Sequence, residues 1–192
     1  TGAIEALREY ESDVELILVG DREVIDAELA RHEVVPNRIS VHHAPDRVQA
    51  HDSPASVIRT KPNSSIVVGL ELQRKRDADA FVSAGSTGAV MATSLFKLRP
   101  LPGVDRPAIG TLLPTAEEQC LLVDAGANVD CKPQHLVQFA HLGNIYAREI
   151  MGRTKPRIAL LNIGKERGKG DELSAAAYEV LNSEDSLNFV GN

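Results

Sequence analysis

Glycines and hydroxyl side chains gather at residues 83–88, where the sequence reads Ser-Ala-Gly-Ser-Thr-Gly. Residues 80–82 before this stretch have the character of a strand end, and residues 87–98 that of a buried helix. A strand that enters a helix through such a turn points backbone N–H groups and the helix dipole at an anion. Phosphate is the anion that we expect. The same residues also suit an ordinary strand-to-helix connection with a serine or threonine cap, so the turn alone is a weak motif.

The turn belongs to a chain in which apolar runs alternate with helix-like stretches. The apolar runs are residues 14–19, 39–41, 80–82, 108–113, 120–124, 157–162 and 187–190. The helix-like stretches are residues 2–10, 23–31, 54–59, 64–76, 87–98, 133–151 and 171–182. This alternation predicts an α/β fold of three layers, Rossmann-like, with a doubly wound, largely parallel sheet and helices on both faces. Ligands of such sheets bind at the carboxyl ends of the strands.

Polar, glycine-rich and basic residues collect at those predicted strand ends. They are residues 20–21, 42–43, 83–88, 124–132 and 162–170. Lys132, Lys165 and Lys169 could neutralise an anion there, although each lysine taken singly also fits a solvated surface charge. His42 and His43 point to opposite faces of a strand, so at most one of them faces a shared site.

Several classes of site are absent from the sequence. Residues 85–88 lack the first element of a dinucleotide GxGxxG motif, and residues 164–170 do not end in the Gly-Lys-Ser/Thr of a P-loop. The 85–88 stretch is not a GxSxG nucleophile elbow either. The six histidines and two cysteines show no zinc spacing. Asp124 and Asp130 could hold Mg²⁺, but capping or turn roles are favoured for both, so we expect neither metal nor cofactor.

Composition limits the partners and the compartment. A net charge of −6 argues against a nucleic-acid binder, which needs a basic face. The two cysteines do not suggest a disulfide framework, so a reducing cytoplasm is expected. No apolar run approaches the ~20 residues of a membrane-spanning helix.

The 192 residues, 43% of them apolar, predict a single α/β domain over residues 1–192 with no internal boundary. The chain opens with Thr1 inside a helix-like stretch and stops at Asn192 directly after a strand-like one. We therefore expect residues to be missing at both ends.

Three blocks of the sequence resemble the PlsX-type phosphate acyltransferases. Residues 83–92 are similar to the family's S-A-G-N-T-G-A-x-M-A, residues 124–140 to D-x-G-A-N-V-D-x-K-P-E-H-L-V-Q-F-A, and residues 160–164 with 169–170 to L-L-N-I-G followed by K-G. Asp52-x-Pro54, Arg59-x-Lys61 and Ser64-Ser65 fit an earlier family pattern. Ser86 replaces the usual Asn, and Gln134 the usual Glu. The family's first strand with its Gly-Gly-Asp turn and a carboxy-terminal part are expected to be missing.

The resemblance implies an enzyme that transfers a long-chain fatty acyl group from acyl carrier protein to inorganic phosphate, for bacterial phospholipid synthesis. It also implies the phosphate acetyltransferase/isocitrate dehydrogenase-like fold and a cytoplasmic homodimer that contacts the inner face of the membrane peripherally, through parts not present here. The alternatives are a phosphate acetyltransferase-like enzyme that uses short acyl-CoA and a non-catalytic lipid-binding scaffold, which predicts no phosphate dependence.

On this interpretation phosphate is the nucleophile, so the protein needs no activated Ser or Cys; it must orient phosphate and stabilise the oxyanion. We expect the turn and Lys132 or Lys169 to hold phosphate, and backbone N–H groups near residues 126–128, or the Asn128 amide, to face the thioester oxygen. His43 is a candidate for proton handling. The predicted catalytic residues are Asn128, Lys132 and His43. The predicted phosphate- and substrate-binding residues are Ser83, Gly85, Ser86, Thr87, Gly88, Gly126, Lys165 and Lys169.

Overall fold

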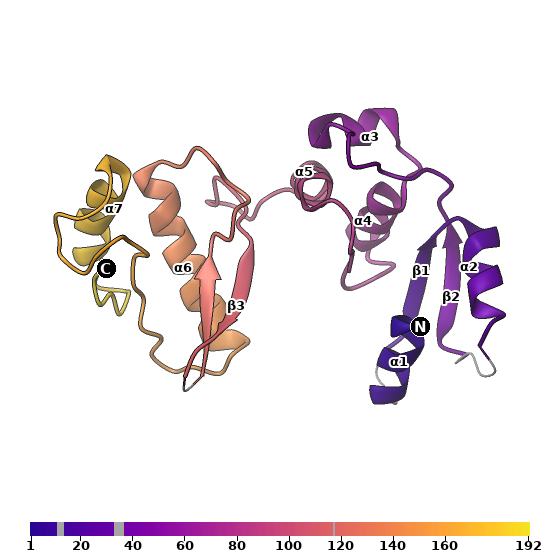
Figure 1. The fold of residues 1–192 in the computed structure, drawn as a ribbon, viewed down its shortest axis with the longest axis horizontal. Coiled ribbons are helices and arrows are strands. Elements are labelled where there is room, and N and C mark those ends of the chain that lie inside the picture. The colour runs from indigo at the N-terminus through magenta and orange to yellow at the C-terminus, as the bar shows by residue number, and fades with distance from the viewer. Residues whose placement is uncertain (11–13, 33–36, 117) are drawn as a thin grey trace. The chain divides into compact units, whose positions relative to one another are not determined.

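The computed structural model describes residues 1–10, 14–32, 37–116 and 118–192 (Figure 1). These residues form two compact units, residues 1–99 and residues 100–192. The single domain expected from the sequence stays a prediction. No helix in the described ranges is long and apolar enough to cross a membrane.

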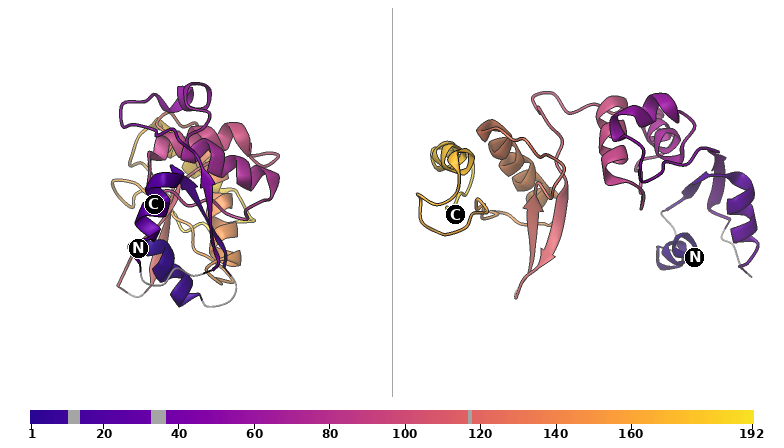
Figure 2. Two further views of the ribbon diagram at one scale, coloured as in Figure 1. Left: turned by 90° about the vertical axis from the view of Figure 1, so that its right-hand side faces the viewer. Right: turned by 45° about the horizontal axis from the view of Figure 1, so that its top comes forward.

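The first unit joins a parallel pair of strands to a group of helices. Its elements are α1 (Gly2–Glu9), β1 (Leu16–Gly20), α2 (Arg22–Leu29), β2 (Ile39–His43), the 3-10 turn η1 (Pro54–Ser56), α3 (Val57–Thr60), α4 (Ser65–Lys75) and α5 (Thr87–Lys97). β1 and β2 pair in parallel from Leu16 beside Ile39 to Gly20 beside His43, and α2 packs on them (Figure 1, Figure 2). The carboxylate of Asp21 caps α2 because it accepts the Glu23 N–H at 3.0 Å.

The core of this unit is built from its helices. It contains Val57 from α3, Ile66, Val67 and Leu70 from α4, and Ala89 from α5, all at most 4% exposed. Phe81 and Val90 pack against this cluster. Phe81 and Ala89 therefore fix residues 83–88 from both sides, which makes the helical core the support of the predicted phosphate turn.

Phe81 reaches this position because α4 carries a glycine beneath it. A Cβ atom on Gly69 would lie only 2.3 Å from the Phe81 ring. Carbon atoms do not approach so closely, so the ring can occupy this place only over a residue without a side chain.

The second unit is a hairpin covered by two helices. Its elements are β3 (Gly110–Pro114), β4 (Gln119–Val123), α6 (Pro133–Glu149) and α7 (Glu172–Asn182). β3 and β4 pair in antiparallel fashion, α6 packs on β4 and α7 packs on α6 (Figure 1, Figure 2). A Cβ atom on Gly143 would lie 3.6 Å from Val123, so this glycine lets α6 lie close against β4. Pro133 is the first residue of α6, as predicted.

Three of the predicted strands are wrong within the described ranges. Residues 80–82 are irregular backbone, because Phe81 turns onto the helical core instead of pairing with a neighbouring strand. Residues 157–162 and 187–190 form no strand either; Ile158 and Phe189 make only an isolated parallel bridge, with the Val190 N–H donating to the Ile158 carbonyl at 2.8 Å. An apolar run predicts that a segment packs against the protein interior, but it does not show whether another strand lies beside it to form hydrogen bonds.

The predicted burial is also too broad. In α5 only Ala89 and Thr93 are buried, while Phe96 is 67% exposed within its unit. The residues of β1, which an apolar run predicted as a strand, are all partly exposed. The helices agree with the predicted ranges to within about two residues.

Candidate functional site

Residues 83–88 form an exposed turn at the start of α5. The Ser83 hydroxyl accepts the Gly85 N–H at 3.1 Å, and the Ser86 hydroxyl accepts the Ala89 N–H at 3.3 Å. Ser86 is thus the N-cap of α5, as its sequence position indicated. The N–H groups of Thr87 and Gly88 meet no protein acceptor among the described residues, as is usual in a first helical turn. The turn brings Ser83, Gly85, Ser86, Thr87 and Gly88 together with donors directed at solvent.

His43 lies at the carboxyl end of β2 and takes part in the start of α2. Its Nδ1 atom accepts the Arg22 N–H at 3.1 Å, while the Arg22 guanidinium donates to the Val41 carbonyl at 2.7 Å. With Nδ1 as acceptor, a neutral imidazole carries its proton on Nε2. These contacts connect His43 to α2, and its role in proton handling stays a prediction.

Asp124 organises the loop that holds Gly126 and Asn128. One carboxylate oxygen accepts the Ile109 N–H at 2.7 Å, and the other accepts the Asn128 N–H at 2.8 Å and the Asn128 side-chain amide at 3.3 Å. The turn role that the sequence favoured for Asp124 is confirmed.

The same hydrogen bonds restrict what Asn128 can donate. Its amide nitrogen also donates to the Pro107 carbonyl at 2.9 Å, so both amide hydrogens have acceptors within the unit. To bind a thioester oxygen, Asn128 would have to give up one of these bonds. The geometry therefore favours backbone N–H groups near Gly126, which is exposed and has φ of 100°, over the Asn128 side chain as the oxyanion donor.

Lys132 ends this loop immediately before α6. Its N–H donates to His135 Nδ1 at 3.1 Å, and its carbonyl accepts the His135 N–H at 2.9 Å. The backbone of Lys132 is fixed in this way, whereas its side chain is exposed. Lys132 and Gly126 thus belong to one loop that leads into the amino-terminal end of α6.

Lys165 and Lys169 belong to a second loop of this unit. The Asn162 side chain donates to the Lys169 carbonyl at 2.8 Å and accepts the Ile163 N–H at 2.8 Å. Gly170 has φ of 92°, and a Cβ atom there would lie 2.5 Å from the Asn162 amide. Asn162 and Gly170 therefore close the loop and leave both lysines exposed to solvent.

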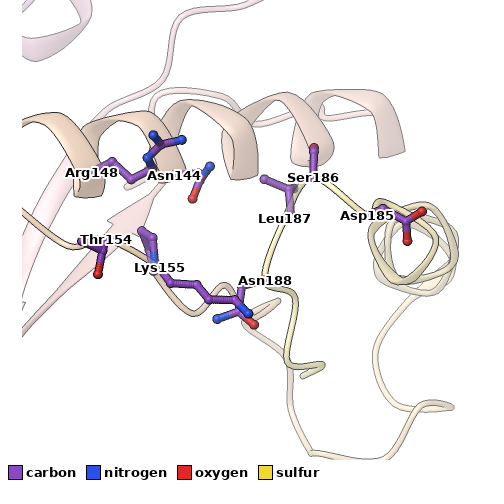
Figure 3. A pocket seen from close by; sticks show the side chains of 9 residues that line it. Asn144, Arg148, Thr154, Lys155, Asp185, Ser186, Leu187 and Asn188 are labelled. Carbon is purple, nitrogen blue, oxygen red and sulfur yellow. The ribbon is translucent and has the colours of Figure 1, made fainter.

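The second unit also contains a cavity of about 220 Å³ that none of the predicted residues lines. It lies beside the carboxyl-terminal half of α6 and is bordered by Arg148, Lys155 and Asp185 together with polar neighbours (Figure 3). The loop of Gly126 and Lys132 precedes the opposite end of α6. This cavity is thus separate from the predicted phosphate-binding residues of its unit.

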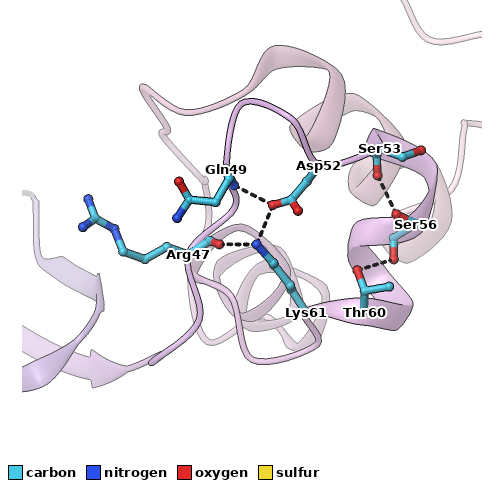
Figure 4. A network of polar contacts seen from close by, with 7 residues as sticks. All are labelled: Arg47, Gln49, Asp52, Ser53, Ser56, Thr60 and Lys61. Atoms are coloured by element: carbon cyan, nitrogen blue, oxygen red, sulfur yellow. Dashed lines mark hydrogen bonds and ion pairs between the residues drawn. The ribbon is translucent and has the colours of Figure 1, made fainter.

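One polar cluster beside the 83–88 turn was given no role in the sequence interpretation. Lys61 donates to Asp52 at 2.6 Å and to the Arg47 carbonyl at 2.8 Å (Figure 4). The Asp52-x-Pro54 and Arg59-x-Lys61 patterns contain Asp52 and Lys61, but an ion pair between the two cannot be read from spacing alone.

Comparison with known proteins identifies the family. A sequence model for the family described as "Fatty acid synthesis protein" matches residues 1–192. The chain is 52% identical over 191 residues to a phosphate acyltransferase of Desulforamulus reducens and 45% identical over 192 residues to one of Salinibacter ruber. These alignments cover 100% of this chain and 56% and 57% of the two relatives, so the chain spans a little over half of their length.

A solved structure supports the predicted fold class. The EutD phosphotransacetylase from Staphylococcus aureus matches with a TM-score of 0.69 at 19% sequence identity, covering 100% of this chain and 63% of that one. This likeness confirms the α/β, Rossmann-like fold predicted from the alternation of strands and helices. With the family match over its whole length, the chain belongs to the fatty acid synthesis protein family, the PlsX-type phosphate acyltransferases that its glycine-rich blocks resemble.

Proposed function

We propose that the protein transfers a long-chain fatty acyl group from acyl carrier protein to inorganic phosphate, yielding an acyl phosphate for bacterial phospholipid synthesis. The observation that carries this proposal is the exposed 83–88 turn, whose free N–H groups at the start of α5 suit phosphate, in a chain related to phosphate acyltransferases.

In the proposed reaction a phosphate oxygen attacks the carbonyl carbon of the thioester. The carbon–sulfur bond then breaks, the carrier thiolate leaves and takes up a proton, and the acyl group remains on phosphate. Phosphate is already an anionic nucleophile and a thiolate is a tolerable leaving group, so the protein contributes mainly orientation and oxyanion stabilisation. The 83–88 turn, with Lys132 or Lys169, would hold phosphate, and N–H groups near Gly126 would face the oxyanion.

The test uses the full-length protein with long-chain acyl carrier protein and inorganic phosphate. Hydroxylamine converts acyl phosphate into a hydroxamate that can be measured. We expect hydroxamate that depends on phosphate and on the long-chain donor. Failure to form it would refute the proposed reaction.

A second candidate is a phosphate acetyltransferase-like enzyme that uses short acyl-CoA. The fold likeness to the staphylococcal phosphotransacetylase favours it. The same assay with acetyl-CoA separates the two, because the acetyltransferase would be saturated by acetyl-CoA and would not require a carrier protein.

The family resemblance also supports a cytoplasmic homodimer that associates peripherally with the inner face of the membrane. Analytical ultracentrifugation tests the dimer, and co-flotation of the full-length protein with phospholipid vesicles tests the membrane contact. A monomer at micromolar concentration, or a protein that stays unbound to vesicles, would contradict the respective statement.

A further inference from the structure

The segment between β2 and α4 is closed by an ion pair. Lys61 lies 2.6 Å from the Asp52 carboxylate, which also accepts the Gln49 N–H at 2.6 Å, and the Lys61 ammonium donates to the Arg47 carbonyl at 2.8 Å (Figure 4). The bond to the Arg47 carbonyl joins the two ends of a stretch of fifteen residues, 47–61, and the two bonds to the Asp52 carboxylate hold its middle. The side chains of Asp52 and Lys61 are only 16% and 25% exposed, so solvent screens this pair less than an ordinary surface pair.

The charges of the pair are present at neutral pH. The hydrogen bond from Lys61, followed by the one from the Gln49 backbone, holds the pKa of Asp52 below its usual range. Asp52 is therefore ionised wherever the enzyme would work, and the bond to Lys61 is charge-assisted.

The segment closed by this pair supports the start of α5. η1, which begins two residues after Asp52, packs against α5. A Cβ atom on Gly88 would lie 3.0 Å from Pro54 Cγ, so Pro54 touches the helix backbone where the first N–H groups of α5 are free. On the other side of the pair, Val48 packs against the core cluster that contains Ala89.

The pair is not itself part of the apolar core. Its residues come from α3, α4 and α5, and none of them is a hydrogen-bond partner of Asp52 or Lys61. The bonds of the pair involve residues 47, 49 and 52, which lead directly into Pro54, the residue that lies against Gly88.

We propose that the Asp52–Lys61 pair is a positioning element for the 83–88 turn, holding Pro54 against Gly88 so that the first N–H groups of α5 converge on one phosphate. This inference rests on the proposed function, since it assigns the pair to the same turn. Asp52 and Lys61 touch no substrate in this account; they act through Pro54.

The first test compares steady-state kinetics of Asp52→Asn and Lys61→Met in the full-length protein. We expect each variant to raise the KM for phosphate about tenfold, with little change in kcat or in the KM for the acyl donor, because displacing a binding group weakens the ligand that it orients. Lys61→Arg keeps a cation with several donors and should recover most of the affinity. The KM for phosphate of the double variant Asp52→Asn/Lys61→Met should be no higher than that of either single variant, because each single substitution already removes the same interaction.

Glu71→Gln is the matched control. Glu71 pairs with Lys97 at 3.2 Å, so the substitution breaks another ion pair of the same unit, near the opposite end of α5. Its KM for phosphate should stay within about twofold of the wild-type value, since that pair does not contact the turn. An equal rise of KM in this control, or an unchanged KM in both Asp52→Asn and Lys61→Met, would overturn the proposal.

A second measurement does not depend on activity. Hydrogen exchange of the Ala89 and Val90 amides, which bond to Ser86, should be faster in Asp52→Asn and Lys61→Met than in the wild type and in Glu71→Gln. Unchanged exchange would overturn the positioning role even if the wild type proved to have another reaction. Conversely, the wild type could form no phosphate-dependent hydroxamate while the variants still show faster exchange than the wild type. That result would refute the proposed function and leave the positioning role standing.

Discussion

At the scale of single residues, Ser86 combines a structural bond with a proposed binding role. Ser86→Ala removes the acceptor of the Ala89 N–H, and the loss of such a cap costs about 1 kcal/mol of unfolding free energy. It should also raise the KM for phosphate, because the first turn of α5 then frays. Ser86→Asn restores the residue usual in the family and a good cap, so we expect it to match the wild type in both measurements.

Urea unfolding and the hydroxamate assay check these values. Ser94→Ala is the control, since it makes the same substitution farther along α5, away from the turn. A Ser86→Ala variant with wild-type stability and wild-type KM would show that the hydroxyl has neither role.

Gly69 shows how one missing side chain positions the turn. Although alanine has a higher helix propensity than glycine, Gly69→Ala would place a methyl group 2.3 Å from the Phe81 ring. We expect a net loss of about 1–3 kcal/mol in unfolding free energy, because the ring must leave its place in the core. Gly2→Ala, with no atom within 4 Å of the new Cβ, is the control and should not destabilise the protein. Equal stability of the two variants would mean that the ring moves away without cost.

At the scale of the elements, Glu71 joins α4 to α5. Its carboxylate accepts hydrogen bonds from Arg74 and lies 3.2 Å from Lys97. These contacts, the one to Arg74 foremost, lower the pKa of Glu71 to about 2, against an ordinary value of 4.5. Because the folded pKa is the lower one, the stabilisation is complete above pH 4.5 and is lost as the pH falls toward 2.

Glu71→Gln should therefore flatten the loss of stability between pH 4.5 and about pH 2, relative to the wild type. Thermal unfolding measured at intervals across this range provides the comparison. Glu5→Gln is the control, since Glu5 is exposed and forms no ion pair among the described residues. If the wild type and Glu71→Gln lose stability in parallel over this range, the low pKa of Glu71 is not realised in the folded protein.

Sequence patterns predict the starts of helices better than they predict contacts between distant segments. The starts of α2, α5 and α7 follow from Asp21, Ser86 and Asp171, because a cap is a local bond between neighbours in the chain. The strand predicted at residues 80–82 failed because Phe81 has a long-range partner, Gly69, that no local pattern reveals. The Asp52–Lys61 pair escaped interpretation for the same reason: its function depends on Pro54 lying against Gly88, thirty-four residues away.

At the scale of the whole molecule, the sequence motifs predicted the family, but the structure was needed to show which atoms of the predicted site are free to bind a ligand. The blocks at 83–92, 124–140 and 160–170 were enough to predict the family, which the match over residues 1–192 shows. They did not reveal that Asn128 donates to Asp124 and Pro107, which leaves the backbone near Gly126 as the favoured oxyanion donor. A family pattern identifies the residues that matter, whereas the atoms that are free to act depend on hydrogen bonds between distant segments.

If the chain is the single domain expected from the sequence, its two compact units should unfold cooperatively. The described residues form two compact units, and a single domain requires that both lose their structure in one transition. Gly69→Ala weakens the first unit, so it should speed hydrogen exchange of the slowest amides in α4 and in α6 alike. The reciprocal change, Phe139→Leu at a side chain that is 2% exposed in the second unit, should act on both helices in the same way.

Mass spectrometry of exchange in the full-length protein, under conditions where the slowest amides report global unfolding, distinguishes the alternatives. If each substitution speeds exchange only in its own unit, residues 1–99 and 100–192 are independent domains and the single-domain prediction is wrong. Saturating phosphate adds a second comparison, because a ligand that binds only the folded protein protects every residue of the cooperative unit to which it binds. In the variant Lys132→Met/Lys169→Met, which lacks the proposed phosphate contacts of the second unit, protection of α6 and α7 would require that both units unfold together, whereas protection limited to α4 and α5 would confine the ligand's effect to the first unit.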